Sequence, residues 1–417
     1  MRDRPGYRWV VLGVGTFAQA STAVYFLGLA AVTPALRDHF GLNLAGVGAL
    51  IGVISVGLIA TLIAWGGAAD RFGERGVMAA GLVGSAVALG AAALVRNPIG
   101  VGALLLIAGA SGASVNAASG RAVLTWFPAR SRGMAMAVRQ TSVPVGAAVA
   151  AVALPAVADA GGIPAVFAVL AGTCLVAAAA VTAWIREPPG HRATGRRPAA
   201  GLGSVLADRR LQRLSVAGLL LVVPQFLGSV FLVEVLSGAD VLGTTRAGTG
   251  LSLAVAGGLL ALTQVLGAVG RLGNGFWSDR AGSRLSPLRA VAAAVAVGFA
   301  LAALLQPGPA PVLAVVLVPA AALAISWNGL VFTAAGELAP PGRAATAMAV
   351  SNTANYVGAA VAPPLGGLVA QAAGWPAMLA MGAAAAVCAL VALRRLSEPR
   401  TLVQTGDGAR ARGVEAP

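Results

Sequence analysis

The sequence predicts an all-α membrane protein with twelve transmembrane helices. Three observations carry this prediction: 58% of the 417 residues are apolar or aromatic, only 10% are charged, and charge, proline or glycine clusters divide the chain into twelve apolar runs. An ordinary soluble domain carries about 25% charged residues. A soluble protein of this size could not cover its core with so little charge, so the composition excludes an ordinary cytosolic enzyme.

Each apolar run is long enough to cross a bilayer, because a hydrocarbon core of about 30 Å requires about 20 apolar residues. The expected spans of the first half are 9–35, 45–67, 77–95, 99–127, 134–158 and 163–184. Those of the second half are 214–236, 247–277, 288–305, 311–335, 345–371 and 375–393. We interpret the N-terminal run as a first span and not as a signal peptide, since it leads to no small-residue cleavage site.

The longest polar stretch divides these spans into six plus six. The domains predicted on this basis are an N-terminal bundle over 1–185, a cytoplasmic linker over 186–213, a C-terminal bundle over 214–396 and a cytoplasmic tail over 397–417. The composition of the linker is that of a flexible segment, with a short surface helix expected near 204–213.

The basic residues set the expected orientation. The formal charge is +15 and all 29 basic residues are arginine, scattered between the apolar runs. With both termini in the cytoplasm, 23 arginines lie in inside segments and three outside, namely Arg37, Arg96 and Arg246. Since basic residues resist translocation, we expect a multi-pass protein of the plasma membrane with both termini cytoplasmic. This scatter argues against nucleic-acid binding, which needs one concentrated basic face.

The two halves of the chain repeat each other, which is the signature of a duplicated unit. Residues 66–75 and 275–284 both read G-x-x-x-D-R-x-G-x-R, at an offset of 209 residues. Three further matches share an offset of 212: Ala-Met-Ala-Val at 135–138 and 347–350, Val-Gly-Ala-Ala-Val at 145–149 and 357–361, and Gly-x-Pro at 162–164 and 374–376.

These repeated motifs resemble the major facilitator superfamily over essentially the whole chain. The G-x-x-x-D-R-x-G-x-R loop is similar to that family's signature between its second and third helices. The resemblance implies two six-helix bundles related by a pseudo-two-fold axis, with a central cavity that opens alternately to each side. Two positions depart from the family pattern, Glu74 and Ser283, where a basic residue is usual.

The two loops are candidates for a cytoplasmic latch. A carboxylate at Asp70 or Asp279 can meet a helix N-terminus and a nearby arginine; the alternative is a solvated loop. Plausible partners are Arg130 or Arg132, and Glu337 with Arg343. The predicted gating residues are Gly66, Asp70, Arg71, Gly73, Arg75, Arg132, Gly275, Asp279, Arg280, Gly282, Arg284, Glu337 and Arg343.

Three arginines lie within the expected spans, at Arg121, Arg139 and Arg271, and no carboxylate lies near the middle of a span. Charges inside a membrane are costly and mark functional sites, and arginine binds oxyanions in a bidentate manner. This pattern favours an anionic substrate. The spacing of Arg271, Gly275 and Asp279 also resembles monocarboxylate and oxalate/formate transporters. The run 120–133 is similar to that of organophosphate carriers.

Each arginine has an alternative role. Arg139 lies close enough to the helix end to snorkel to the surface. Arg121 fits a gate as well as a cavity, and Arg271 fits a structural pair with Glu337. Polar residues at helical depth are candidate cavity lining or interhelical hydrogen bonds. They are Gln19, Tyr25, Asn116, Gln140, Gln225, Gln264, Asn328, Asn352, Asn355 and Tyr356.

The sequence thus predicts a secondary active transporter that works by alternating access, with a small organic or inorganic anion as substrate. Coupling by proton symport or anion exchange would use Glu234, Glu337 or the substrate itself. The alternatives are drug or metabolite efflux by proton antiport and, in a different class, a non-transporting membrane sensor. We expect no enzyme activity, cofactor or metal, because the sequence contains no Ser/His/Asp set, metal cluster or nucleotide loop, and both cysteines, Cys174 and Cys388, lie in apolar runs. The expected partners are the small-molecule substrate and the lipid bilayer, and we expect a monomer.

Overall fold

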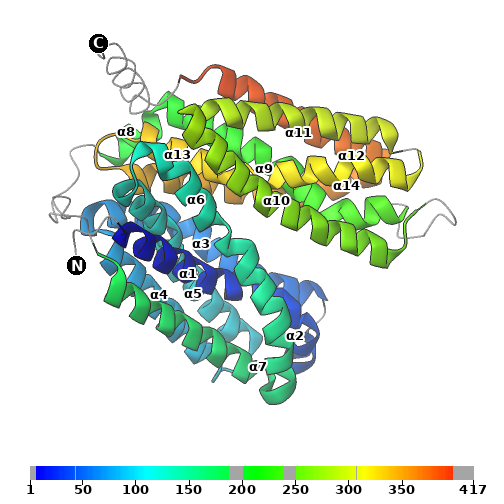
Figure 1. The fold of residues 1–417 in the computed structure, drawn as a ribbon. Helices are drawn as coiled ribbons and strands as arrows, with labels where there is room; N and C mark the ends of the chain where they lie inside the picture. The colour runs from blue at the N-terminus through cyan, green and yellow to red at the C-terminus, as the bar shows by residue number, and fades with distance from the viewer. Residues whose placement is uncertain (1–5, 43, 187–200, 239–249, 307, 398–417) are drawn as a thin grey trace, which may run out of the picture. The chain divides into compact units, whose positions relative to one another are not determined.

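Helices form every regular element in the part of the chain that the computed structural model describes, which is residues 6–42, 44–186, 201–238, 250–306 and 308–397 (Figure 1). The first half contains α1 (Tyr7–Gly28), η1 (Leu29–Val32), α2 (Thr33–Phe40), α3 (Leu44–Phe72), α4 (Glu74–Ala92), α5 (Pro98–Trp126), η2 (Ala129–Ser131), α6 (Arg132–Gln140) and α7 (Ser142–Trp184). The second half contains α8 (Leu202–Ala207), α9 (Arg209–Ser237), α10 (Leu253–Ala281), α11 (Leu285–Leu305), α12 (Ala310–Ile325), α13 (Asn328–Leu338) and α14 (Ala344–Arg394).

Two of the helices, α7 and α14, each contain a bend between two membrane spans. The described residues form ten helical stretches that are long and apolar enough to cross a membrane, including α14 with 51 residues. At 1.5 Å per residue such a helix is about 75 Å long, against a bilayer core of about 30 Å. Gly162 and Gly374, related by the repeat, break these helices with φ values of 69° and 81°. Because only glycine adopts such φ values readily, each long helix consists of two helical segments that join at its glycine.

Several spans are helices in series. The first stretch combines α1, η1 and α2, the fifth joins α6 to α7 at Thr141, and the ninth joins α12 to α13 at Ser326 and Trp327. Exposed apolar side chains such as Val152 and Val315 lie along the spans, as expected for a protein surrounded by lipid. The structure thereby agrees with the all-α membrane fold predicted from the sequence.

A short helix, α8, lies in the second half of the predicted linker. The structure has α8 over Leu202–Ala207, and α9 begins at Arg209, some residues before the predicted span. The Asp208 side chain caps the start of α9, because it accepts a hydrogen bond from the Arg210 N–H at 2.8 Å. Residues 187–200, Arg246 and the tail from residue 398 lie outside the described residues, as does the start of the span expected at 247.

The residues group into two compact units by their contacts. Unit 1 comprises 1–128, 138–206 and 339–353, and unit 2 comprises 129–137, 207–338 and 354–417. The units follow the two halves of the sequence except for segments 129–137 and 339–353. In unit 1, α5 packs against α1, α3 and α4, and α7 packs against α1 and α4 (Figure 1). In unit 2, α12 packs against α9, α10 and α11. These packings place the polar groups described next.

Candidate functional site

In unit 1, a carboxylate from α3 binds the first turn of α14. The buried Asp70 side chain accepts hydrogen bonds from the backbone N–H groups of Ala345 and Thr346, at 2.9 and 2.8 Å. The Thr346 hydroxyl donates to the same carboxylate at 2.6 Å. N–H groups in the first turn of a helix have no acceptor within the helix, and the helix dipole favours negative charge there. Asp70 therefore acts as an anchor for the start of α14.

Unit 2 contains the same arrangement between α10 and α6. Asp279 accepts hydrogen bonds from the N–H groups of Gly133 and Met134, at 2.9 and 2.7 Å. Gly133 and Met134 correspond to Ala345 and Thr346 at the offset of 212 residues found in the sequence. The internal repeat is thus present in the contacts as well as in the motifs.

The ion pairs around the two carboxylates differ. In unit 1, Arg121 of α5 lies 2.6 Å from Glu74 through Nη1 and 3.6 Å from Asp70 through Nε. The Thr125 hydroxyl also donates to Glu74, at 3.2 Å. Glu74, the acidic residue where the family pattern has a basic one, is fully buried and pairs with Arg121. The structure thus places the Arg121 guanidinium beside Asp70 and Glu74.

In unit 2, two arginines share one glutamate. Arg284 Nη1 lies 2.7 Å from Asp279, and its Nε lies 3.3 Å from Glu337. Arg132 Nη1 lies 3.4 Å from the other oxygen of Glu337. Arg284 also donates to the Ala129 carbonyl. Because the Arg284 and Glu337 side chains are both fully buried, removing either would leave a buried charge with fewer partners.

Glycines allow these helix ends to approach. A Cβ atom on Gly66 would lie 2.8 Å from the Ala349 Cβ and 2.9 Å from the Ala345 carbonyl oxygen. On Gly275 it would lie 2.7 Å from the Gly133 carbonyl oxygen. Real Cβ atoms essentially never approach so closely, so these two positions require glycine in the observed packing.

The remaining predicted gating residues surround these contacts. Gly73 and Gly282 follow or end a helix with positive φ, Arg71, Arg75 and Arg280 are exposed, and Arg343 is half-buried. Water screens the charge of the exposed arginines beside the two carboxylates, so each of them contributes little to the stability of these contacts.

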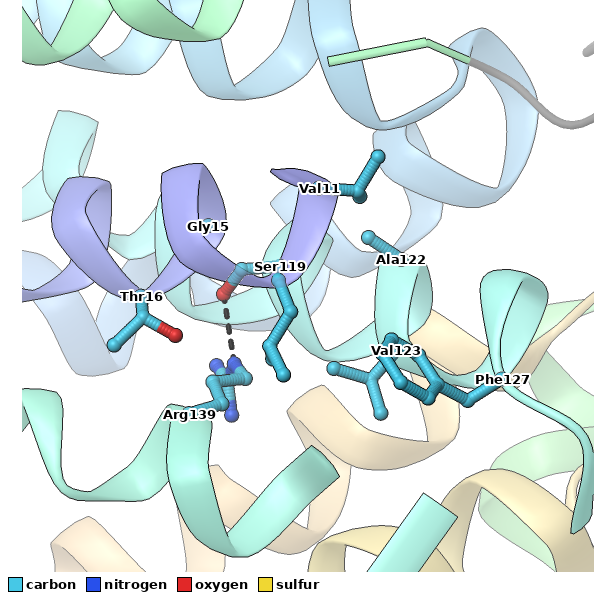
Figure 2. A pocket seen from close by; sticks show the side chains of 9 residues that line it. Val11, Gly15, Thr16, Ser119, Ala122, Val123, Phe127 and Arg139 are labelled. Atoms are coloured by element: carbon cyan, nitrogen blue, oxygen red, sulfur yellow. Dashed lines mark hydrogen bonds between the residues drawn. The ribbon is translucent and has the colours of Figure 1, made fainter. Parts of the chain in front are cut away.

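A second polar group, also in unit 1, is centred on Arg139 in the last turn of α6 (Figure 2). Its side chain is 1% exposed. Its guanidinium donates to Ser119 Oγ at 2.8 Å, to Gln140 Oε1 at 2.9 Å and to the Asn116 carbonyl at 2.7 Å. Hydrogen bonds to a charged donor are about twice as strong as neutral ones. Arg139 is therefore held inside the unit and does not snorkel to its surface.

Neighbouring amides extend this group to α1 and α14. Asn352 Nδ2 donates to Asn116 Oδ1 at 3.0 Å, and Gln19 Nε2 lies 3.5 Å from Gln140 Oε1. The Ser119 hydroxyl lies 3.3 Å from Gln19 Oε1. Asn352 occupies the position that repeats Gln140, so the two related positions meet in one network. Buried polar networks of this kind hold one side-chain arrangement when all members have partners.

A small pocket adjoins Arg139, between α1, α5 and α6. Figure 2 shows the guanidinium beside Ser119 and Thr16, opposite an apolar wall. The pocket is lined by Val11, Leu12, Gly15, Thr16, Ser119, Ala122, Val123, Phe127 and Arg139. Sequence reasoning missed Thr16 and did not select Ser119. A helical spacing of three residues, from Thr16 to Gln19 and from Asn116 to Ser119, is the signal that places each pair on one face.

Arg271 forms a separate polar group in unit 2. Its Nε donates to the Ile325 carbonyl at 2.9 Å and its Nη2 to Asn328 Oδ1 at 3.3 Å. The break between α12 and α13 exposes this carbonyl to a side chain. Asn274, three residues after Arg271, donates to Ser326 Oγ at 2.8 Å and was missed from the sequence. Glu337, proposed as a partner of Arg271, pairs with Arg132 and Arg284.

The other candidate lining residues occupy varied positions. The Tyr25 hydroxyl donates to the Ala108 carbonyl at 3.0 Å, an interhelical hydrogen bond. Asn355 is buried against Gly218 of α9, and Gln225 is on the same helix as Gly218. Glu234, a coupling candidate, is exposed. Among the described residues, no three histidine, cysteine, aspartate or glutamate side chains gather as metal ligands.

The chain matches known proteins over most of its length. Residues 12–363 and 337–416 match the Major Facilitator Superfamily. The chain belongs to the major facilitator superfamily. An uncharacterized MFS-type transporter of Mycobacterium tuberculosis is 33% identical over 376 residues, which is 90% of this chain and 82% of that protein. This major facilitator protein is accordingly a secondary transporter of the membrane and not an enzyme.

Solved structures share its fold at low identity. The E. coli fucose:proton symporter superposes with a TM-score of 0.74 and 15% identity, covering 92% of this chain and 97% of the symporter. The human organic anion transporter MFSD10 gives 0.72 and 19%, with 93% and 99% covered. At these identities the likeness shows the twelve-helix major facilitator fold, and the choice of substrate depends on this chain's own residues.

Proposed function

We propose that this major facilitator transporter carries a small anion across the plasma membrane by alternating access. The observation that supports this most directly is the buried Arg139 guanidinium at the wall of a pocket that is otherwise mostly apolar. A guanidinium shielded from water binds a carboxylate, phosphate or similar oxyanion strongly and through two parallel hydrogen bonds. Ionisable groups within spans are expensive, and substrate binding is a common reason for them.

Arg271 supports the same substrate class in unit 2. It is 8% exposed and lies at the break between α12 and α13, where Ile325 and Asn328 orient its guanidinium. Carbonyl and amide oxygens fix the plane of a guanidinium without changing its charge. Such a fixed plane is the geometry that recognises a planar carboxylate.

The two anchored helix starts are the proposed gate. Asp70 and Asp279 hold the first turns of α14 and α6 in the observed arrangement, at helix ends for which the arginine distribution predicts a cytoplasmic location. Each anchor consists of hydrogen bonds that can break and re-form as the transporter changes state. The cycle would couple to protons by symport, or to a second anion by exchange, with Glu234, Glu337 or the substrate as the proton carrier.

Uptake into proteoliposomes tests the substrate class. The purified protein is reconstituted and offered labelled small carboxylates, phosphate and sulfate, with and without an inward proton gradient or an internal counter-anion. We expect uptake of at least one anion, increased by one of the two driving forces. Arg139→Gln and Arg271→Gln are each expected to reduce it at least about tenfold, the value of about 1.4 kcal/mol of lost binding energy.

Two matched variants sharpen this experiment. Arg139→Lys keeps the charge but loses the planar fork, so its uptake should lie between that of wild type and Arg139→Gln. Arg96→Gln removes an exposed arginine between α4 and α5 and should transport as wild type. Uptake of cationic dyes without any anion, or full anion uptake by both glutamine variants, would contradict the proposal.

A further inference from the structure

Five arginines that the transport proposal does not use meet at one end of unit 2. They are Arg209 and Arg213 at the start of α9, Arg289 near the start of α11, and Arg394 and Arg395 at the end of α14. We refer to these five residues as the arginine patch.

Hydrogen bonds bring the three helix ends of the arginine patch together. Arg213 Nη1 donates to the Arg395 carbonyl at 3.3 Å. Arg289 Nη2 donates to the Leu393 carbonyl at 2.9 Å and to the Leu396 carbonyl at 2.5 Å. The last carbonyls of a helix have no donor within it, so these arginines complete the end of α14. Arg213 and Arg289 therefore have a structural task within the patch.

The other three arginines of the patch, Arg209, Arg394 and Arg395, are exposed. Among the described residues next to the patch in the chain, the acid is Asp208, which pairs with Arg210 at 3.3 Å. Partial burial raises the pKa of the Asp208 carboxyl, but hydrogen bonds from Arg210 outweigh it and hold the pKa below its ordinary value. Asp208 is thus charged at neutral pH and balanced by Arg210, so within the described part of the chain it does not offset the five positive charges of the arginine patch.

Exposed apolar side chains lie one helical turn along α9 and α14 from the arginines of the patch. Val216 follows Arg213 by three residues and is 49% exposed, and Val391 precedes Arg394 by three residues and is 50% exposed. Val387, one turn further into α14, is 49% exposed. Since residues three or four apart share a helix face, the surface changes from arginine to valine along the same faces of α9 and α14.

We propose that the arginine patch binds the headgroup of an anionic phospholipid. The phosphate would contact Arg209, Arg394 and Arg395, and the acyl chains would lie along Val216, Val387 and Val391. A phospholipid is favoured over a soluble anion because only an amphiphile covers both the charged and the apolar part of this surface. Clusters of basic residues beside membrane spans attract anionic lipids by about 1 kcal/mol per residue, a factor of about five each.

Native mass spectrometry of the purified transporter tests this site. The protein in mild detergent is titrated with phosphatidylglycerol or with phosphatidylcholine of the same chains. We expect tighter retention of phosphatidylglycerol, and a loss of about 10- to 30-fold in Arg394→Gln/Arg395→Gln. The matched control is Arg37→Gln/Arg96→Gln, which removes two exposed arginines at other helix ends and should retain phosphatidylglycerol as wild type does.

Further measurements distinguish lipid binding from the other roles that these arginines could have. Wild-type retention of phosphatidylglycerol should fall with added salt, whereas that of phosphatidylcholine should not; this measurement needs no variant to fold. Equal retention of the two lipids, or equal losses in the test and control variants, would show that these arginines serve orientation alone. Displacement of the lipid by an equal concentration of inorganic phosphate would show a soluble-anion site and would also overturn the proposal.

Discussion

At the scale of single residues, the two anchoring aspartates permit a matched test. In Asp70→Asn the charge at the start of α14 is lost. The asparagine side chain has one acceptor oxygen, whereas the aspartate uses two, one for the N–H of Ala345 and one for that of Thr346. Losing such a helix N-terminal contact costs about 1–2 kcal/mol. We expect the transport rate to fall by about five- to thirtyfold for Asp70→Asn, and similarly for Asp279→Asn.

Transport of the predicted anion and the unfolding midpoint are measured together for these variants. Asp38→Asn, an exposed change on α2, is the control and should alter neither. Wild-type transport by both Asp70→Asn and Asp279→Asn would exclude the gate, whereas equal losses of folded protein and transport would indicate a purely structural role.

The Glu74–Arg121 pair makes a second prediction at this scale. Glu74→Gln removes the acid from a buried 2.6 Å ion pair and leaves Arg121 beside Asp70 alone. Removing one partner of a buried pair destabilises a protein by about 3 kcal/mol, less here because Arg121 is 18% exposed. We expect a lower unfolding midpoint for Glu74→Gln and partial recovery in Glu74→Gln/Arg121→Gln. Additive losses in this double-mutant cycle would contradict the coupling.

Some of these residues could be found from the sequence and some of their partners could not. Asp70 and Asp279 stand out because a charged motif occurs twice. Their acceptor role depends on backbone N–H groups of Ala345 and Gly133, which no side chain marks. The sequence predicts a cavity or a gate for Arg121 and does not separate the two, since its partner Glu74 lies 47 residues away in the chain.

At the scale of helices, the contact between α3 and α14 depends on Gly66, which has no side chain to separate the two helices. Gly66→Ala would place a Cβ 2.8 Å from the Ala349 Cβ, and overpacking of this kind costs about 1–3 kcal/mol. We expect Gly66→Ala and Gly275→Ala to lower transport and the unfolding midpoint. Gly76→Ala, on α4 with no atom within 4 Å of the added Cβ, should be neutral or slightly stabilising. Three equal midpoints would show that the helix ends can separate without cost.

The helices themselves were accessible from the sequence to within a few residues, because hydrophobic length determines a span in lipid. The breaks inside the spans could not be predicted from the sequence. Thr141 between α6 and α7, and Ser326 with Trp327 between α12 and α13, carry no proline or glycine signal at the break. The second break exposes the Ile325 carbonyl to Arg271, so a feature of the candidate site depends on a local irregularity that hydropathy does not report.

At the scale of the whole chain, the bends at Gly162 and Gly374 decide the topology. If α7 crosses the membrane twice, six spans precede the linker, and the N-terminus, the linker and the C-terminus lie on one side. If α7 and α14 each cross once, five spans precede the linker and five follow it, so the linker lies opposite both termini. A stretch of 56 residues from Ala129 to Trp184 is about 84 Å long as a straight helix, nearly three times the bilayer core, which favours two crossings.

Reporter fusions distinguish these two topologies. A fluorescent protein that folds only in the cytoplasm, or an alkaline phosphatase active only outside, is fused after Gly190 and, separately, after Pro417. We expect fluorescence and no phosphatase activity from both positions, since the 23 arginines of the N-terminus, linker, tail and inner loops resist translocation. Phosphatase activity after Gly190 with fluorescence after Pro417 would mean single crossings by α7 and α14. Phosphatase activity at both positions would keep the twelve spans but reverse the orientation, and with it the cytoplasmic location of the Asp70 and Asp279 gate.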